Sequence, residues 1–209
     1  MRLPVAPEGI PFIAGCSVVT LVFALGYPPL ALVGVICTSF VCYFFRDPER
    51  IPACGDDEII SPADGTILSV ATVEEPTFRG EDSVRISIFM SVFDVHVNRA
   101  PVTGRLVYDR YNPGKFELAW RDKASEINEQ HSFGIESRGH RILVRLIAGY
   151  VARRIVPYVR PECDLLQGQR IGMIRFGSRV DIFLPSHVEV CVKQGQKVYA
   201  GSTVLGVLS

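Results

Sequence analysis

A glycine–serine pair near the C-terminus, Gly177-Ser178, lies between two stretches that read as β-strands. Such a pair is a common turn former, because glycine tolerates positive φ and serine bonds to its own backbone. A hydrolase nucleophile is disfavoured here. The second glycine of a G-x-S-x-G elbow is missing, and a strand rather than a helix follows.

The two residues of this pair could instead react with each other. The Ser178 hydroxyl can attack the preceding carbonyl of Gly177 and turn the amide into an ester, and glycine leaves that carbonyl unshielded. Elimination of the ester and hydrolysis with loss of ammonia leave a pyruvoyl group, whose ketone can form a Schiff base with an amine and accept electrons. Such a ketone suits a chain whose four lysines all lie among turn or polar residues and not in an apolar pocket: Lys115, Lys123, Lys193 and Lys197.

Two further stretches carry residues suited to activating a serine. "SPADG" (61–65) places Asp64 at a turn before a strand, and "SVFDVHVNRAPVTG" (91–104) carries His96 two residues after Asp94. Taken singly, Asp64 is typical of a turn and His96 of a hydrogen-bonded strand histidine. Together with Ser178 they supply a nucleophile, a base and a group that orients the base.

The composition of the chain argues against several other classes of function. The 209 residues carry 22 basic and 22 acidic side chains, so no global field favours nucleic acid. No cysteines form a CxxC pair and the four histidines have no metal-binding spacing, so we expect free thiols and no metal site.

The N-terminal segment has no Asp, Glu, Lys, Arg or His from Gly9 to Phe45, a run of 37 residues. Pro28-Pro29 breaks the run, which predicts an apolar helical hairpin with spans of about 9–26 and 30–45. The hairpin can span the bilayer or lie in it, and a pair of core helices in a soluble protein is the alternative. Arg2, Arg46 and Arg50 flank the run, so a membrane hairpin would leave both ends on the cytoplasmic side.

Beyond this segment, short alternating runs of Val, Ile and polar residues are separated by Gly, Pro, Asn and Asp. They predict a mainly β domain, of sandwich or barrel type with little helix, over 46–209, following a membrane-associated hairpin over 1–45. The one stretch with helical character is "FELAWRDKASEINEQ" (116–130).

The segments "FFRDPER", "SPADG", "FDVHVNRAPVTG", "YNPGKFELAWRDKASEINEQ" and "RFGSRVDIFLP" occur in that order along the chain. In this combination the chain resembles the phosphatidylserine decarboxylase proenzyme family, in its short bacterial and archaeal form. The resemblance covers nearly the whole length.

The resemblance implies self-cleavage between Gly177 and Ser178, giving a β chain (1–177) and an α chain (178–209) that starts with a pyruvoyl group made from Ser178. It further implies that this covalent cofactor forms a Schiff base with membrane phosphatidylserine, which loses carbon dioxide and leaves as phosphatidylethanolamine. Ser178, His96 and Asp64 are the implied site residues. The implied assembly is a heterodimer of the two fragments, with higher oligomers left open, at the cell membrane and with its catalytic domain in the cytoplasm.

Two departures leave the processing base open. Longer family members carry an HxxH pair, whereas the second position here is Arg99, which cannot act as a base at ordinary pH. They also carry "LGST" where this chain has "FGSR". His96 is the remaining candidate both for the base in processing and for the group that protonates the carbanion left by decarboxylation.

Three alternatives also remain. One is the same chemistry on a related lipid such as archaetidylserine. Another is a lipoyl- or biotinyl-like carrier module with Lys123 as its modified lysine, although Lys123 lies in a polar, helix-like stretch and not at a hairpin tip. The third is a structural, membrane-anchored β domain in which Gly177-Ser178 is only a turn.

Overall fold

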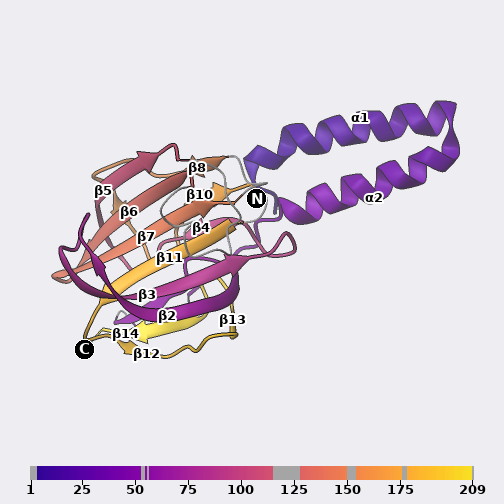
Figure 1. Ribbon diagram of the computed structural model, residues 1–209. Coiled ribbons are helices and arrows are strands. Elements are labelled where there is room, and N and C mark those ends of the chain that lie inside the picture. Colours follow the sequence, from indigo (N-terminus) through magenta and orange to yellow (C-terminus); the bar gives the residue numbers. More distant parts are fainter. Residues whose placement is uncertain are drawn as a thin grey trace. The chain divides into compact units, whose positions relative to one another are not determined.

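The computed structural model describes residues 4–52, 55, 57–114, 128–149, 154–175 and 178–208. Two compact units make up the chain, Met1–Glu49 and Arg50–Ser209 (Figure 1).

The N-terminal unit is a helical hairpin, as its sequence predicts. A short 3₁₀ turn, η1 (Pro7–Gly9), leads into α1 (Ile10–Gly26), and α2 (Pro28–Phe44) follows after Tyr27. Pro28 begins the second helix, where a missing N–H costs nothing. The described stretch from Pro7 to Gly26 is long and apolar enough to cross a membrane, and α2 is a shorter apolar helix.

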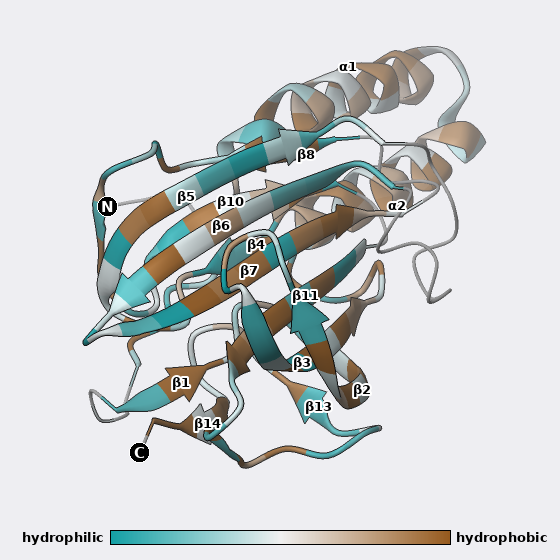
Figure 2. Ribbon diagram, turned by 60° about the vertical axis from the view of Figure 1, so that its left-hand side comes forward, coloured by the Kyte–Doolittle hydropathy of each residue, from teal (hydrophilic) through white to brown (hydrophobic). Residues whose placement is uncertain are grey.

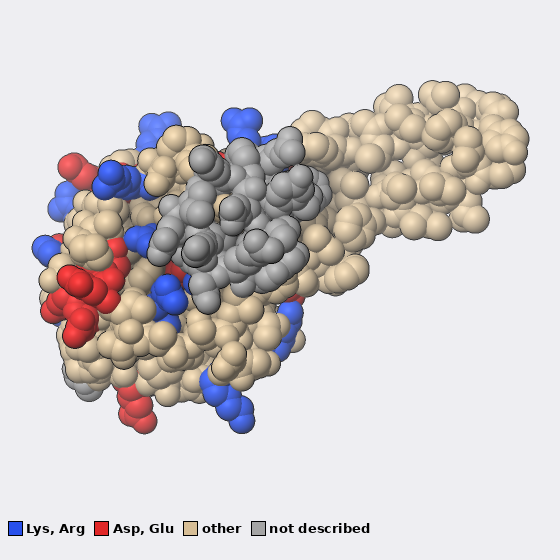
Figure 3. Space-filling model, viewed as in Figure 1, with Lys and Arg blue, Asp and Glu red and all other residues tan. Residues whose placement is uncertain are grey.

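Small and hydroxyl-bearing residues let the two helices approach closely. A side chain at Gly34 would lie 2.6 Å from the Thr20 hydroxyl, so glycine is needed at this contact. The Thr20 and Thr38 hydroxyls lie 3.2 Å apart and link the helices. The face of the hairpin visible in Figure 3 shows no charged side chain, in keeping with the uncharged sequence from Gly9 to Phe45.

The second unit is built from antiparallel strands and confirms the mainly β prediction. The strands are β1 (Glu58–Ile60), β2 (Gly65–Glu75), β3 (Glu81–Met90), β4 (Val97–Arg99), β5 (Gly104–Asn112), β6 (Gln130–Ser137), β7 (His140–Ala148), β8 (Ile155–Pro157), β9 (Asp164–Leu165), β10 (Arg170–Ile174), β11 (Ser178–Pro185), β12 (Glu189–Val190), β13 (Lys197–Val198) and β14 (Val204–Val207). Within the described ranges they form an eight-stranded sheet, ordered β13-β2-β3-β11-β7-β6-β5-β9, and two small sheets, β1-β14-β12 and β4-β10-β8. The helix expected over 116–130 lies mostly outside the described residues, and its last residue, Gln130, opens β6.

The strand β11 occupies an interior position in the large sheet. It pairs with β3 on one side and β7 on the other, so Ser178 lies opposite both Met90 and Ala148. All eight of its residues are buried. Side chains alternate between the two faces of a strand, and Val180 and Ile182 of β11 belong to the hydrophobic core. Figure 2 shows the neighbouring β7 as mostly hydrophobic, interrupted by hydrophilic residues.

The opposite face of β11 carries a buried ion pair. The Arg179 guanidinium donates to both oxygens of Asp181, at 2.6 and 3.0 Å, and also to the Ser87 hydroxyl on β3, at 2.9 Å. Both charged side chains are almost fully excluded from solvent. Burying a charge without a partner is costly, so this pair fixes the conformation of the strand directly after Ser178.

Gly65 marks a close approach between β2 and β3 and gives a test of the fold. A side chain at this position would lie 2.1 Å from the backbone oxygen of Phe89. We expect Gly65→Ala to lower the free energy of unfolding by roughly 1–3 kcal/mol, because backbone must move to accept the methyl group. Urea unfolding monitored by circular dichroism measures this, with Gly55→Ala as the control because its nearest neighbour would be 4.0 Å away. Equal stability of the two variants would contradict the pairing of β2 and β3 described here.

Candidate functional site

The side chain of Ser178 is fully buried at the start of β11. Its hydroxyl donates to the sulfur of Met90, at 3.3 Å, and has no other hydrogen-bond partner among the described residues. A thioether is a weak acceptor, so little energy holds the hydroxyl in this direction. The preceding Gly177 lies outside the described residues.

The residue Asn98, in the middle of β4, contacts the same sulfur. Its Nδ2 lies 3.7 Å from the Met90 sulfur and 3.5 Å from the backbone oxygen of Pro62, in the "SPADG" loop. Both contacts are long, and Asn98 is fully buried. The sequence interpretation did not single out this residue. The available signal was its place in the "FDVHVNRAPVTG" stretch, between His96 and Arg99.

His96 is also fully buried and directly precedes β4. Its Nδ1 lies 2.9 Å from the backbone oxygen of Asp94, and its own backbone oxygen accepts from Ile174 of β10, at 3.3 Å. Because a carbonyl can only accept, Nδ1 carries the proton of the neutral ring. The nitrogen able to take up a proton is therefore Nε2.

The turn before His96 is held by the Asp94 side chain. One carboxylate oxygen accepts from the backbone N–H and the hydroxyl of Ser91, at 2.9 and 2.8 Å, and the other accepts from Lys197 of β13, at 2.6 Å. Burial raises the pKa of Asp94, but the hydrogen bonds from Lys197 and Ser91 lower it by more, so its pKa lies below the usual value. The carboxylate therefore remains charged at neutral pH and keeps the turn closed.

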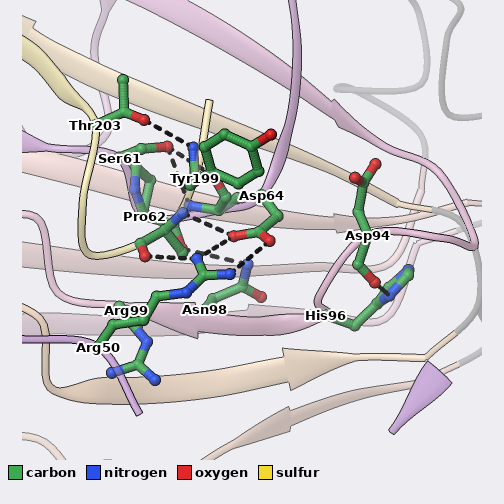
Figure 4. Close-up of polar contacts among 12 residues, drawn as sticks. Arg50, Ser61, Pro62, Asp64, Asp94, His96, Asn98, Arg99, Tyr199 and Thr203 are labelled. Atoms are coloured by element: carbon green, nitrogen blue, oxygen red, sulfur yellow. Dashed lines mark hydrogen bonds and ion pairs between the residues drawn. The ribbon is translucent and has the colours of Figure 1, made fainter. Parts of the chain in front are cut away.

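The carboxylate of Asp64 is directed away from His96 (Figure 4). It forms a two-pronged ion pair with Arg50, one bond being 2.8 Å, and accepts from the backbone N–H of Ala200, at 2.7 Å. These are its hydrogen bonds among the described residues. The structure thus brings His96 together with Asp94 and Asp64 together with Arg50. The expectation that Asp64 orients His96 stays a prediction without a direct contact to support it.

Arg99, at the position where longer family members carry a histidine, is buried against backbone. Its guanidinium donates to the oxygen of Gly168, at 2.9 Å, and its backbone N–H donates to Pro62, also at 2.9 Å. The residue therefore ties β4 to two loops.

The "SPADG" loop is bound to the C-terminal segment through backbone hydrogen bonds. Ser61 donates to the oxygen of Thr203, at 2.8 Å, and Gly201 donates to the oxygen of Ser61, at 2.9 Å. With the bond from Ala200 to Asp64, these contacts join the loop to the turn that follows β13 (Figure 4).

The described part of the chain holds no group of three or more His, Cys, Asp or Glu residues placed to bind a metal ion. The five described cysteines, Cys16, Cys37, Cys42, Cys163 and Cys191, are free thiols. Lys123, the residue on which the carrier alternative depends, lies outside the described residues. The candidate polar groups are a buried serine and a weakly bonded amide that contact the same Met90 sulfur, and a buried histidine held by the Asp94 backbone oxygen.

Comparison with known proteins assigns the family. The family model described as phosphatidylserine decarboxylase matches residues 37–206. A phosphatidylserine decarboxylase proenzyme of Symbiobacterium thermophilum is 47% identical over 212 residues, covering 100% of this chain and 98% of the relative. Proenzymes of the same name from Geotalea uraniireducens and Beijerinckia indica are 44% and 47% identical, covering 98% and 97% of this chain and 97% and 88% of the relatives. The chain therefore belongs to the phosphatidylserine decarboxylase family.

Proposed function

We propose that this chain cuts itself between Gly177 and Ser178, converts Ser178 into a pyruvoyl group, and decarboxylates phosphatidylserine to phosphatidylethanolamine. Family membership supports the activity, and relatives named as proenzymes support the processing. The observation that carries the residue assignment is the buried Ser178 hydroxyl at the start of β11, held only by a thioether among its described neighbours.

The proposed cleavage is an internal rearrangement of the chain. The Ser178 oxygen bonds to the carbonyl carbon of Gly177, the carbon–nitrogen bond breaks, and the nitrogen takes up a proton, which leaves an ester. Loss of the Cα proton of Ser178 then breaks its Cβ–O bond and releases Gly177 as a carboxylate. The dehydroalanine that remains takes up water and loses ammonia to give the ketone.

His96 is the proposed base. Its Nδ1 is occupied by the Asp94 carbonyl, so Nε2 is the nitrogen that accepts the proton of Ser178. Arg99 is unsuited to this step, because a guanidinium keeps its protons at ordinary pH and this one is bound to Gly168.

The contacts of β11 explain how the two fragments would stay together as a heterodimer. The strand β11, which begins at Ser178, pairs with β3 along its length and with β7 from Ser178 to Phe183, and Arg179 binds Ser87 across the cut. Lys197 and Ala200 bind Asp94 and Asp64 of the other fragment. Cleavage before residue 178 removes none of these interactions.

The site described above fits a small ketone at residue 178. The surroundings are buried and contain an amide with little bonding of its own. A pyruvoyl ketone at this position would supply an electrophile for the substrate amine and a sink for the electrons of the bond to the departing carboxylate. In that reaction His96 holds the proton that is returned to the substrate carbon.

The proposed role of the hairpin is to give the β domain access to its lipid substrate. The apolar segment 9–45 keeps the protein at the bilayer where its lipid substrate resides, with the β domain on the cytoplasmic side because Arg46 and Arg50 follow the second helix.

Replacement of Ser178 tests the cleavage directly. We expect Ser178→Ala to remain a single full-length chain, whereas the parent chain gives two fragments, because alanine has no oxygen to attack Gly177. Mass spectrometry under denaturing conditions measures both, and the C-terminal fragment of the parent should be lighter than a serine-ended peptide by one ammonia. An ordinary N-terminal serine on that fragment would exclude a pyruvoyl group.

Replacement of His96 tests the proposed base. We expect His96→Ala to slow processing, decarboxylation or both by about 10²–10⁴-fold, the usual loss when one proton-transfer group is removed. Time courses of precursor loss and of carbon dioxide release separate the two steps. Wild-type rates in both would remove His96 from the mechanism.

Removal of the hairpin tests substrate access. We expect a chain starting at Arg46 to process itself, because the core cluster of the β unit contains no residue of the hairpin. Its turnover of phosphatidylserine in vesicles should fall, by roughly 10²-fold if the hairpin acts as a tether. Short-chain, dispersed phosphatidylserine should restore activity. Equal turnover on vesicles by the truncated and full chains would contradict this role.

A further inference from the structure

The side-chain amide of Asn98 is fully buried, and its oxygen finds no hydrogen-bond donor among the described residues. A buried acceptor without a donor is destabilising, because it has lost its hydrogen bonds to water without replacement. The direction of the amide is set by Pro62, whose backbone oxygen can only accept and therefore faces Nδ2, 3.5 Å away. The open end of the amide is thus the acceptor, Oδ1.

The amide that carries this acceptor shares a neighbour with the residue that the proposed reaction modifies. Ser178 Oγ is 3.3 Å and Asn98 Nδ2 is 3.7 Å from the same sulfur, that of Met90. The Asn98 amide therefore belongs to the immediate surroundings of residue 178. The strand β4 that carries Asn98 pairs with β10, which fixes its backbone.

The chemistry of the head group identifies the donor that fits an open acceptor. Phosphatidylserine offers a phosphate diester and a carboxylate, which at neutral pH only accept hydrogen bonds, and a primary amine, which donates them. The amine is also the group that must approach the ketone. An amide oxygen accepts from it both as an ammonium and after loss of a proton.

We propose that Asn98 Oδ1 binds the primary amine of the substrate and orients it toward residue 178. This inference rests on the proposed function, since it requires the ketone at that position. Asn98 is then a substrate-binding residue of the decarboxylase, in addition to Ser178 and His96. A purely structural role, joining β4 to the Pro62 loop, predicts lower stability with unchanged amine capture.

The test uses the full-length protein in detergent and the variants Asn98→Leu and Asn98→Asp. Leucine has a similar size and no acceptor, whereas aspartate keeps an acceptor oxygen. Denaturing mass spectrometry measures cleavage after Gly177, and labelling by hydroxylamine measures the ketone. The probe for the site is glycerophosphoethanolamine, whose amine is captured covalently on the C-terminal fragment in the presence of cyanoborohydride. This probe has no carboxylate, so capture reports amine binding without decarboxylation.

We expect Asn98→Leu to be cut and labelled by hydroxylamine like the parent, but to capture the probe about 10- to 100-fold more slowly, the usual loss for a hydrogen bond to a charged group. Asn98→Asp should retain capture. If leucine prevents folding, Asn98→Ala replaces it with the same expectation. The control is Ser137→Ala at the C-terminal end of β6. It removes a buried hydrogen bond to the backbone oxygen of Thr103 and should leave capture of the probe unchanged.

Two outcomes overturn the inference: parental capture by an acceptor-free variant, or a folded acceptor-free variant that is not cut. An uncut parent chain that hydroxylamine does not label would instead overturn the proposed function itself. The parent chain thus tests the proposed self-cleavage, and the Asn98 variants test the proposed binding of the amine.

Discussion

The pairing of β11 with β3 and β7 is the constraint on which the rest of the β unit depends. β11 pairs with β3 from Ser178 to Pro185 and with β7 from Ser178 to Phe183, and all eight of its residues are buried. Its first residue is Ser178, so the hydroxyl that we propose as the nucleophile lies at the start of a strand whose backbone is fixed. A chain break at that point would leave the ladder intact. The same strand can thus serve as the reactive end of a fragment and as a central part of the sheet.

Charged residues strengthen this arrangement at three positions. Arg179 and Asp181 bind each other beside Ser178, Lys197 binds Asp94, and Arg50 with Ala200 binds Asp64. The last two contacts join the segment after residue 178 to the turns that carry the predicted site residues. Asp64 is accordingly best placed to hold the C-terminal segment in position, and Asp94 to hold the turn that presents His96.

Much of the architecture could be predicted from the sequence because it depends on local patterns. The uncharged run with Pro28-Pro29 predicts the hairpin, and the alternating runs after it predict a mainly β unit. The motifs around Asp64, His96 and Ser178 also indicate the correct family.

The long-range contacts could not be predicted, because they depend on strand register. Lys197 meets Asp94 across 103 residues, and Asp64 meets Arg50 instead of His96. The burial of Asn98 next to the Met90 sulfur likewise follows from the pairing of β4 and β10, which no local pattern specifies.

The central claim is that the chain is cut before Ser178 while β11 remains in the sheet. The most direct measurement is the mass of one purified sample under native and then denaturing conditions. We expect a single species of about the full-length mass under native conditions, which separates into fragments 1–177 and 178–209 only when the protein is denatured. A full-length chain under both conditions, or loss of the C-terminal fragment without denaturation, would contradict it.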